Sequence, residues 1–533
     1  MKKKRIIIIA GLVIIILLAV AAYVLLVLKD EDNNKKRSEK TINGTVKKSK
    51  YTLTGNSLED FDLYFMQLEN EKVNKIYSPL SIKYALAMLN EGAKGETRKQ
   101  IENVIGDYEA KQYTNSSNLS LANAMFIKND FKDGVKSDYI DTLKKNYNAE
   151  VVYDDFTTPD KVNAWVSEKT LKLINNLVSD ISNYNFILIN ALAIDMDWNE
   201  KFLENQGMWT IYAHENFSWI GPESVLGNKF NNNATVAGME IDASLNNYDI
   251  VTKLGEDSIR DTVSKAYREY MNDPINAAEV EYILGNDKSE EHINQVINDY
   301  LEKYIPELNS NYKKVDYNTE FMLYVDDSVK AFAKDLKEYD GTTLQYVGIM
   351  PISEDLDSYI NNMNAKKINK IIGSLKELKL ENFNDGVVTR IKGFIPKFKF
   401  EYNLDLMADL KKLGINDVFD SDKSDLSHIS DTKGLYVNDA IHKANIEFTQ
   451  DGIKASAATF IGGRGAAGAF DYKYDVPVEK IDLTFDRPYM FVIRDKQSGE
   501  VWFAGTVYEP SPWSEDADYN DSEFSLYKQN EDH

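Results

Sequence analysis

The sequence predicts an α+β fold, and three observations indicate this class. The hydrophobic fraction of 43%, with 11% aromatic residues, is enough for sizeable buried cores. Amphipathic helical patterns occur early in the chain, in residues 57–70, and again in residues 257–271 and 289–308. Strand-like apolar runs occur as well, one ending at Ser78–Pro79 and one around His442. A chain that mixes both kinds of element favours the α+β class.

The first predicted elements follow one another closely. Ser57 with Asp60 three residues later approximates a capping box, and it opens a helix with one apolar face. A short strand ends at Ser78–Pro79. A buried helix then ends at Gly92, and a second helix starts at Gly95. The apolar positions that predict these three helices are Phe61, Tyr64, Phe65, Leu68, Ile82, Leu86, Leu89, Ile101, Val104 and Ile105.

The N-terminus predicts a transmembrane signal anchor in residues 1–28. Residues 6–28 are uncharged and apolar and follow a basic cluster, and as a helix these 23 residues would span roughly 34 Å. The basic cluster should stay cytoplasmic, so we expect a single-pass protein of the cell membrane with the bulk of the chain extracellular. Cleavage as a signal peptide is the alternative, because Ala19–Ala22 weakly resembles a cleavage site. We expect residues 29–50 to form a polar linker and residues 511–533 an acidic, disordered tail.

The composition excludes several classes of function. The net charge of −23 argues against nucleic acid, because binding there requires Lys and Arg side chains that neutralise phosphates. The absence of cysteine excludes disulfides, thiolate metal sites and cysteine nucleophiles. The five histidines include no pair with metal-ligand spacing, and "GGRG" at 462–465 lacks the Lys–Ser/Thr of a phosphate loop. We therefore expect no catalytic residues, no metal and no cofactor.

Several blocks of sequence resemble one protein family, the serpins, and they occur in that family's order. These blocks are "YSPLSIKYALAMLNEGAKGETRKQIENVIG" (77–106), "LSLANAMFIKNDF" (119–131), "VNAWVSEKTLKLINNLV" (162–178), "FILINALAIDMDWNEKF" (186–202), "DLMADLKKLGINDVFDSDKSDLSHIS" (405–430) and "LTFDRPYMFVIRDKQSGEVWFAGTVYEP" (483–510). One departure is Tyr489, where the family normally has Phe. The resemblance implies the serpin fold of three β-sheets surrounded by about nine helices, with an exposed reactive-centre loop.

The resemblance also divides the chain. It covers roughly 57–202 and 320–510, so we expect residues 51–204 and 321–510 to form the two parts of a serpin domain, with the reactive-centre loop in 450–485. Residues 205–320 are far longer than the family's usual connection, and their helical patterns predict an inserted helical subdomain. A tolerated surface insertion and a dedicated binding module both remain open for it.

The family's shutter region, which holds the two central strands of its main sheet together, has matching residues here. By resemblance, His442 is the buried histidine of this region, and its expected neighbours are Ser78, Ser81 and Asn190. The strand-like run around His442 also favours a hydrogen-bonded core histidine over a catalytic one.

The stretch "DGIKASAATFIGGRGAAGAF" at 451–470 predicts an insertable loop. Serpins present such a loop as bait; the target protease cleaves it and forms an acyl-enzyme, and the freed part then inserts as a strand into the main sheet. Small side chains suit a segment that must enter a packed interior. The hinge residues implied by the resemblance are Gly452, Ile453, Ala455, Ser456, Ala457, Ala458 and Thr459.

Alternation along this loop can be assigned from the hinge glycine. Ile453, Ala455, Ala457, Thr459 and Ile461 should point to the core after insertion, and Lys454 should point outward. A register slip of one residue would bury Lys454. Ile453 is bulkier than the Thr or Ser that the family usually has there, and we expect it to slow insertion.

Counting from the hinge places the scissile bond at Ala466–Ala467, which predicts an elastase-like or subtilisin-like target. Arg464 is the rival and would select a trypsin-like protease, and Gly465, Gly468 and Lys473 remain further alternatives.

The resulting hypothesis is a monomeric, membrane-anchored inhibitor that traps serine proteases, or cysteine proteases, as a suicide substrate. The rival is a non-inhibitory serpin that binds or adheres through residues 205–320. A hydrolase on this scaffold lacks the necessary residues.

Overall fold

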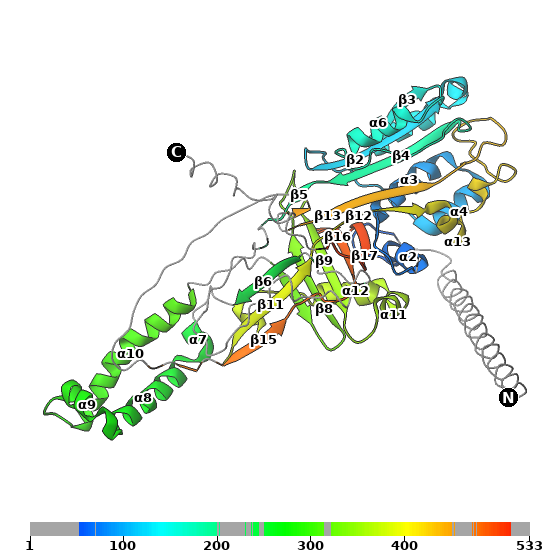
Figure 1. The fold of residues 1–533 in the computed structure, drawn as a ribbon. Helices are drawn as coiled ribbons and strands as arrows, with labels where there is room; N and C mark the ends of the chain where they lie inside the picture. Colours follow the sequence, from blue (N-terminus) through cyan, green and yellow to red (C-terminus); the bar gives the residue numbers. More distant parts are fainter. Residues whose placement is uncertain are drawn as a thin grey trace, which may run out of the picture.

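The computed structural model describes residues 53–69, 71–199, 202, 230, 236, 238–244, 250–313, 321–449, 452–453, 472, 474–475 and 477–512. Helices and strands are mixed throughout these ranges, and the predicted α+β class is confirmed. A large body of sheets and helices occupies one side of Figure 1, and a helical unit, α7–α10, extends from it on the other.

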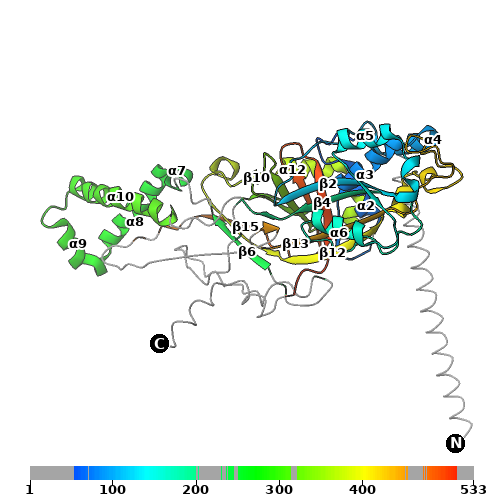
Figure 2. The same ribbon diagram turned by 90° about the horizontal axis from the view of Figure 1, so that it is seen from above.

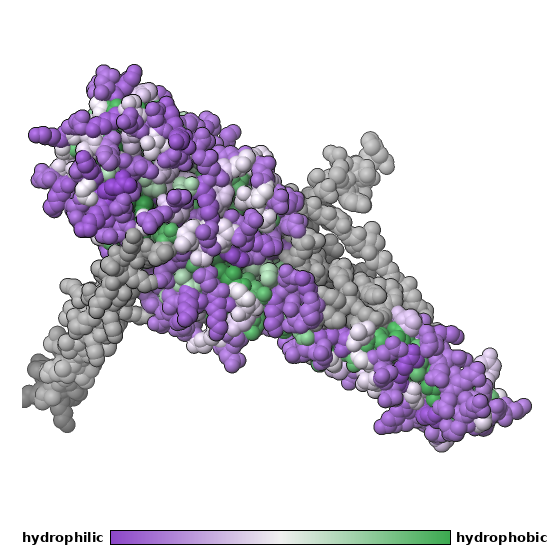
Figure 3. Space-filling model, turned by 180° about the vertical axis from the view of Figure 1, so that it is seen from behind, coloured by the Kyte–Doolittle hydropathy of each residue, from purple (hydrophilic) through white to green (hydrophobic). Residues whose placement is uncertain are grey.

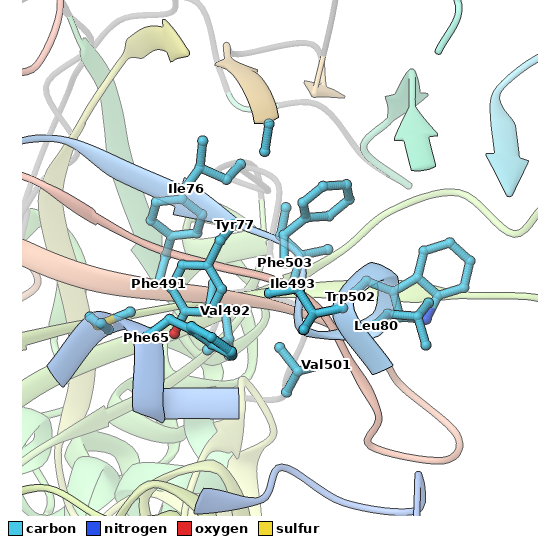
Figure 4. Close-up of a cluster of buried hydrophobic side chains, with 14 of the residues drawn as sticks. Phe65, Ile76, Tyr77, Leu80, Phe491, Val492, Ile493, Val501, Trp502 and Phe503 are labelled. Atoms are coloured by element: carbon cyan, nitrogen blue, oxygen red, sulfur yellow. The ribbon is translucent and has the colours of Figure 1, made fainter. Parts of the chain in front are cut away.

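A seven-stranded sheet forms the centre of the body. Its order is β1-β17-β16-β9-β8-β7-β10, with the strands β1 (Lys75–Tyr77), β7 (Met322–Val325), β8 (Val329–Asp335), β9 (Leu344–Pro351), β10 (Lys376–Glu377), β16 (Tyr489–Asp495) and β17 (Val501–Val507). β9 and β17 are buried along their whole length, as expected for strands covered on both faces. Figure 4 shows β1, β16 and β17 packing their apolar side chains against Phe65 and Leu80. The ring of Tyr489 is fully buried and lies edge-on to Phe485 at 5.0 Å.

The N-terminal part of the body is largely helical. Its helices are α2 (Asp60–Leu68), α3 (Pro79–Gly92), α4 (Gly95–Ile105) and, after the 3₁₀ helix η1 (Asn129–Gly134), α5 (Ser137–Tyr147). Helices α2 and α3 contact β17 of the seven-stranded sheet, and α4 and α5 pack against α3. The predicted end of α3 at Gly92 and the predicted start of α4 at Gly95 are confirmed. The predicted capping box of α2 was wrong by two residues: it joins Glu59 and Asp62, whose carboxylate accepts the Glu59 N–H at 2.8 Å. The buried Lys83 ammonium lies 2.7 Å from that carboxylate and holds Asp62 in place.

A second layer of strands, called the main sheet below, consists of separate hydrogen-bonded pieces. One has the order β3-β2-β4 and another pairs β12 with β13, and the bounds are β2 (Leu119–Lys128), β3 (Glu150–Asp154), β4 (Phe186–Ile194), β12 (Phe398–Asp405) and β13 (Ile441–Phe448). A third piece pairs β5 (Met196–Asp197) with β14 (Gly452–Ile453). Helix α6 (Asp160–Lys169) packs on one face of β2 and β4, and α3 packs on the opposite face. Even-numbered residues of β4, such as Leu192 and Ile194, face the main core on the α3 side.

The remaining elements complete the body around these sheets. They are α11 (Leu356–Asn362), α12 (Ala365–Gly373), α13 (Leu406–Lys412) and the 3₁₀ helices η4 (Leu380–Asn382) and η5 (Asp417–Phe419). A three-stranded sheet, β15-β11-β6, lies at the end nearest the helical unit and consists of β6 (Gly238–Ser244), β11 (Val388–Pro396) and β15 (Val478–Asp482).

The helical unit has a core of its own. It consists of α7 (Ile250–Leu254), α8 (Glu256–Asn272), η3 (Pro274–Asn276), α9 (Ala277–Leu284) and α10 (Glu290–Lys313). The amphipathic pattern predicted for residues 257–271 corresponds to α8, whose Ile259, Val263 and Tyr267 are buried against α10. Ser289 precedes α10, and its Oγ accepts the N–H of His292 at 3.3 Å while its carbonyl accepts that of Ile293. Viewed from above, in Figure 2, the unit lies on the side of the body opposite α4 and α5. The face in Figure 3 is mostly hydrophilic, over the body and over the unit.

Candidate functional site

The main sheet is interrupted between β4 and β13. Within the described residues, no hydrogen-bonded ladder joins these two strands, although both line the same cavity of about 160 Å³. A smaller cavity of about 20 Å³ lies further along, between Ile194 of β4 and Ile446 of β13. Edge strands leave backbone N–H and C=O groups without ladder partners. The two cavities together define a gap along most of the length of both strands, called the gap below.

One end of the gap is closed by a short bridge. Gly452 pairs with Asp197, and Ile453 pairs with Met196, in an antiparallel ladder. Beside it, the indole N–H of Trp198 donates to the carbonyl of Thr449 at 3.0 Å. The two halves of the main sheet are therefore joined where β4 and β13 both end and where the predicted loop begins.

The α3 side of the gap holds the predicted shutter histidine. Nε2 of His442 accepts the backbone N–H of Ser78 at 2.8 Å, so the proton of the neutral ring is on Nδ1. Ser78 also caps α3, because its Oγ accepts the N–H of Ser81 at 3.0 Å. Burial lowers the pKa of His442 to about 4. The imidazole is thus neutral at physiological pH and joins β13 to α3.

The predicted neighbour Asn190 lines the same cavity as His442, Ser78 and Ser81. Its amide N–H donates to Oδ1 of Asn123 on β2 at 2.8 Å, and Asn123 in turn donates to the carbonyl of Tyr147 at 2.7 Å. The amide oxygen of Asn190 is buried and accepts no hydrogen bond from the described residues. The structure therefore brings the four residues to one cavity, with Asn190 bonded to β2 and His442 bonded to α3.

A cover over the gap was missed by the sequence analysis. Residues 170–178, directly after α6, contribute Thr170, Ile174, Leu177 and Val178 to the wall of the larger cavity. Asn163 of α6 holds this cover: its Oδ1 accepts the N–H groups of Leu177 and Val178 at 2.8 and 3.1 Å, and its amide donates to the Val178 carbonyl at 2.8 Å. In the described part of the chain, no hydrogen bond joins the cover to β4 or β13. The one available signal was the polar Asn163 on an otherwise apolar helix face.

The predicted loop residues are only partly within the described ranges. Gly452 and Ile453 form β14, and Tyr472 and Tyr474 lie on the helical unit. The remaining predicted hinge residues and both candidate bonds, at Arg464 and at Ala466–Ala467, lie outside the described residues.

Neither a metal site nor a membrane span is found among the described residues. No group of three or more His, Asp or Glu side chains there is arranged to hold a metal ion. No helix there has the length and apolarity that a membrane crossing requires, and the predicted anchor in residues 1–28 lies outside these ranges.

Comparison with known proteins places these features in a family. A family profile described as "Serpin (serine protease inhibitor)" matches residues 57–213 and 317–510. Neuroserpin of Mus musculus is 25% identical over 83% of this chain and 87% of its own. Leukocyte elastase inhibitor of Xenopus tropicalis is 23% identical over 84% of this chain and 97% of its own. The crystal structure of the thermophilic serpin tengpin in its native state, 20% identical, covers 86% of this chain and 96% of its own with a TM-score of 0.55.

Proposed function

Because the chain belongs to the serpin family of serine protease inhibitors, we propose that it traps a target protease as a suicide substrate. The protease cleaves the loop in residues 450–485 and forms an acyl-enzyme with it. The freed N-terminal part of the loop then enters the gap as a new strand and carries the bound protease with it. The catalytic chemistry belongs to the protease, and we propose no enzymatic activity for the chain itself.

The observation that carries this proposal is the gap between β4 and β13, which begins where the loop begins. A strand placed there would give ladder partners to both edges. At roughly 1 kcal/mol per net hydrogen bond, a strand of about a dozen residues supplies on the order of 10 kcal/mol before packing is counted. That free energy is sufficient to drive a large rearrangement.

The register of β14 supports the proposed alternation. Continuing the Gly452–Asp197 and Ile453–Met196 pairs one residue at a time puts Ala457 across from Leu192. Residues directly opposite in an antiparallel pair point to the same face, and Leu192 faces the main core. Ala457 would therefore point inward, as the sequence pattern predicts. Lys454 would lie across from Asp195 on the outer face, where opposite charges attract.

The same register gives Thr459 a partner. It would lie across from Asn190, whose buried amide oxygen accepts no hydrogen bond from the described residues. A threonine hydroxyl can donate to that oxygen. We propose that insertion satisfies Asn190 in this way, so that the shutter cavity is completed by the loop.

For the target we propose an elastase-like or subtilisin-like serine protease, with cleavage at Ala466–Ala467. The small residues at this position support it, and so does the similarity to a relative named for inhibiting leukocyte elastase. Cleavage after Arg464 by a trypsin-like protease is the alternative.

The direct test mixes the full chain with pancreatic elastase, subtilisin or trypsin and looks for an SDS-stable covalent complex. We expect a complex with an elastase-like or subtilisin-like enzyme. We also expect a released C-terminal fragment whose mass corresponds to a chain that begins at Ala467. A fragment starting at Gly465 would assign the bond to Arg464 instead. If every protease of the panel cleaves the loop and keeps its full activity, inhibition is ruled out.

Ala457→Arg tests strand insertion with the fold left intact. An arginine at this position would have to be buried beside Leu192, so we expect cleavage without a complex and at least a tenfold higher ratio of cleaved to trapped inhibitor. Lys454→Arg is the matched control, because it places the same side chain on the outer face and should trap protease normally. Equal complex yields from both variants would contradict insertion in this register.

The alternative, a non-inhibitory binding protein, is favoured by one observation. Ile275 and Tyr282, on η3 and α9 of the helical unit, are 89% and 91% exposed. The family profile leaves residues 214–316 unmatched, which supports our proposal that residues 205–320 are an insertion into the serpin domain. Absence of a covalent complex with any protease would support a binding role for it.

We further propose that residues 1–28 anchor a monomer in the cell membrane with residues 29–533 outside. The uncharged segment 6–28 behind a basic cluster supports this. In cells expressing the full chain, we expect resistance to alkaline carbonate extraction and accessibility to protease added from outside. Release by carbonate would contradict the anchor.

A further inference from the structure

The far end of the predicted loop lies on the helical unit. Tyr472 and Tyr474 follow the candidate bonds in sequence, and both are half-buried against the core of α8 and α10. The backbone N–H of Tyr474 donates to the hydroxyl of Tyr304 at 3.1 Å, and that of Tyr472 donates to the hydroxyl of Tyr300 at 3.4 Å. The ring of Tyr472 meets that of Tyr304 edge-on, at 6.4 Å between centroids.

The spacing of these tyrosines explains the fit. Tyr300 and Tyr304 lie one helical turn apart on α10, with stacked rings 5.5 Å between centroids. Residues two apart in an extended chain repeat every ~7 Å with their N–H groups on the same side, and a helical turn rises ~5.4 Å. An extended segment lying beside α10 can therefore offer alternate N–H groups to hydroxyls on successive turns.

The unit that holds this segment is itself fixed to the body. The buried ammonium of Lys253, on α7, donates to the Phe383 carbonyl at 2.7 Å and to the Asp385 carboxylate at 3.0 Å. In return, the N–H of Gly386 donates to the Lys253 carbonyl at 3.1 Å. Shortly after Tyr474 the chain enters β15, which pairs with β11 of the body.

We propose that the helical unit is a brace that holds the C-terminal leg of the bait loop on Tyr300 and Tyr304. The intact loop is then held at β14 on one side of the candidate bonds, and at the brace and at β15 on the other. Until Tyr472 and Tyr474 leave the brace, only the residues between β14 and the brace are available to enter the gap. Cleavage between these attachments frees the N-terminal part and leaves the brace in place. The brace thus suppresses insertion without cleavage. The consequence for insertion rests on the proposed inhibitory function, whereas the brace itself does not.

Hydrogen exchange on the full chain tests the brace directly. The variant Tyr300→Phe/Tyr304→Phe removes both accepting hydroxyls and keeps the rings in the core of the unit. We expect the amides of Tyr472 and Tyr474 to exchange at least about fivefold faster in it than in the wild type. Tyr282→Phe, at an exposed tyrosine away from the loop, is the matched control and should leave the exchange unchanged. Equal exchange at these two amides in all three proteins would overturn the proposal.

A second measurement separates the brace from the inhibitory function. Uncleaved Tyr472→Ala/Tyr474→Ala protein is warmed, and the fraction whose loop can still be cleaved by subtilisin is followed with time. We expect this fraction to fall several-fold faster than in the wild type, whereas an unchanged rate would contradict suppression of insertion. If no protease forms a covalent complex but exchange changes as expected, the inhibitory function fails and the brace stands. If complexes form and exchange is unchanged, only the brace fails.

Discussion

The imidazole of His442 can keep its bond to α3 only while Nε2 is unprotonated, because it accepts the Ser78 N–H there. Burial lowers its pKa to about 4, well below that of a histidine in an unfolded chain, about 6.5. Between these two values the unfolded chain binds a proton that the folded chain does not. The stability from this group is therefore fully present above pH 6.5 and is lost as the pH falls toward 4.

We predict a loss of up to about 3 kcal/mol in the free energy of unfolding over this pH window from His442 alone. His442→Gln retains an oxygen that can accept the Ser78 N–H and does not titrate. Thermal and urea unfolding at pH 7.5, 5.5 and 4.5 should show a smaller acid destabilisation in the variant. The same pH dependence in both proteins would show that His442 is not responsible.

For Asp409 of α13 we predict the opposite pH dependence of the free energy of unfolding. Its carboxylate is fully buried, with Oδ1 3.0 Å from the Lys412 ammonium. Burial raises its pKa to about 6, so the folded state binds a proton more tightly than the unfolded state does. The stability from this group is present below about pH 4 and is lost as the pH rises through 6.

Asp409→Asn should therefore stabilise the protein by about 1–2 kcal/mol at pH 7.5, with the gain disappearing near pH 4. Urea unfolding at both pH values measures the difference. A gain of equal size at both pH values would point to packing and away from the buried charge.

At the same scale, Ser78, Ser81, Asn190 and His442, which the resemblance implies as neighbours, line one cavity. It did not give their bonds, because the partner of Asn190 is Asn123, which is brought opposite it only by the pairing of β2 with β4. The capping of α2 was misplaced for a similar reason. Lys83, distant in the sequence pattern, fixes Asp62 and so selects the capping pair.

Among the elements, helices were predicted better than the division of the main sheet. The apolar faces of α8 and α10 follow the helical period, which is a local property of the sequence. The gap is a missing ladder between β4 and β13, and no local pattern in either strand distinguishes a paired edge from an unpaired one. The cover at 170–178 depends on the three hydrogen bonds of Asn163, which is equally non-local.

Asn163→Ala should loosen the cover without changing the gap itself. Losing three hydrogen bonds should cost about 1–3 kcal/mol of stability, and the amides of residues 177–178 should exchange faster. If the cover must lift for a strand to enter, complex formation with a protease should also become faster. Asn175→Ala, which removes a single exposed bond to Ser167, is the matched control. Unchanged exchange in Asn163→Ala would show that other contacts hold the cover.

For the whole molecule, the intact chain is predicted to be less stable than the cleaved one. Filling the gap adds on the order of 10 kcal/mol, which for a chain of this length raises Tm by roughly 10 °C. Scanning calorimetry before and after a single cut in the loop measures the shift. Cleaved Ala457→Arg should show a much smaller increase, and a Tm that does not rise in the wild type would contradict a gap that accepts the loop.

The combination of body and helical unit was only partly predictable. Periodicity predicts the helical patterns in residues 257–271 and 289–308, and these correspond to α8 and α10, whose apolar faces form a separate core. The contact between this unit and Tyr472 and Tyr474 joins segments about 170 residues apart, and no local pattern in the sequence predicts it.

The two residue pairs of β14 also set a length. Ala466 lies thirteen residues after Ile453, so a fully extended strand would move it about 44 Å from the bridge, compared with about 37 Å for Arg464. In the same register Ala466 would come to lie across from Asn183, just beyond the start of β4. The loop is therefore long enough to run the full length of β4, and under the proposed mechanism an enzyme bound at Ala466 would be carried to the end of β4 that lies away from the β14 bridge. The distance that the bound enzyme moves therefore depends on the number of residues between the hinge and the cleaved bond, as well as on which residue is cut.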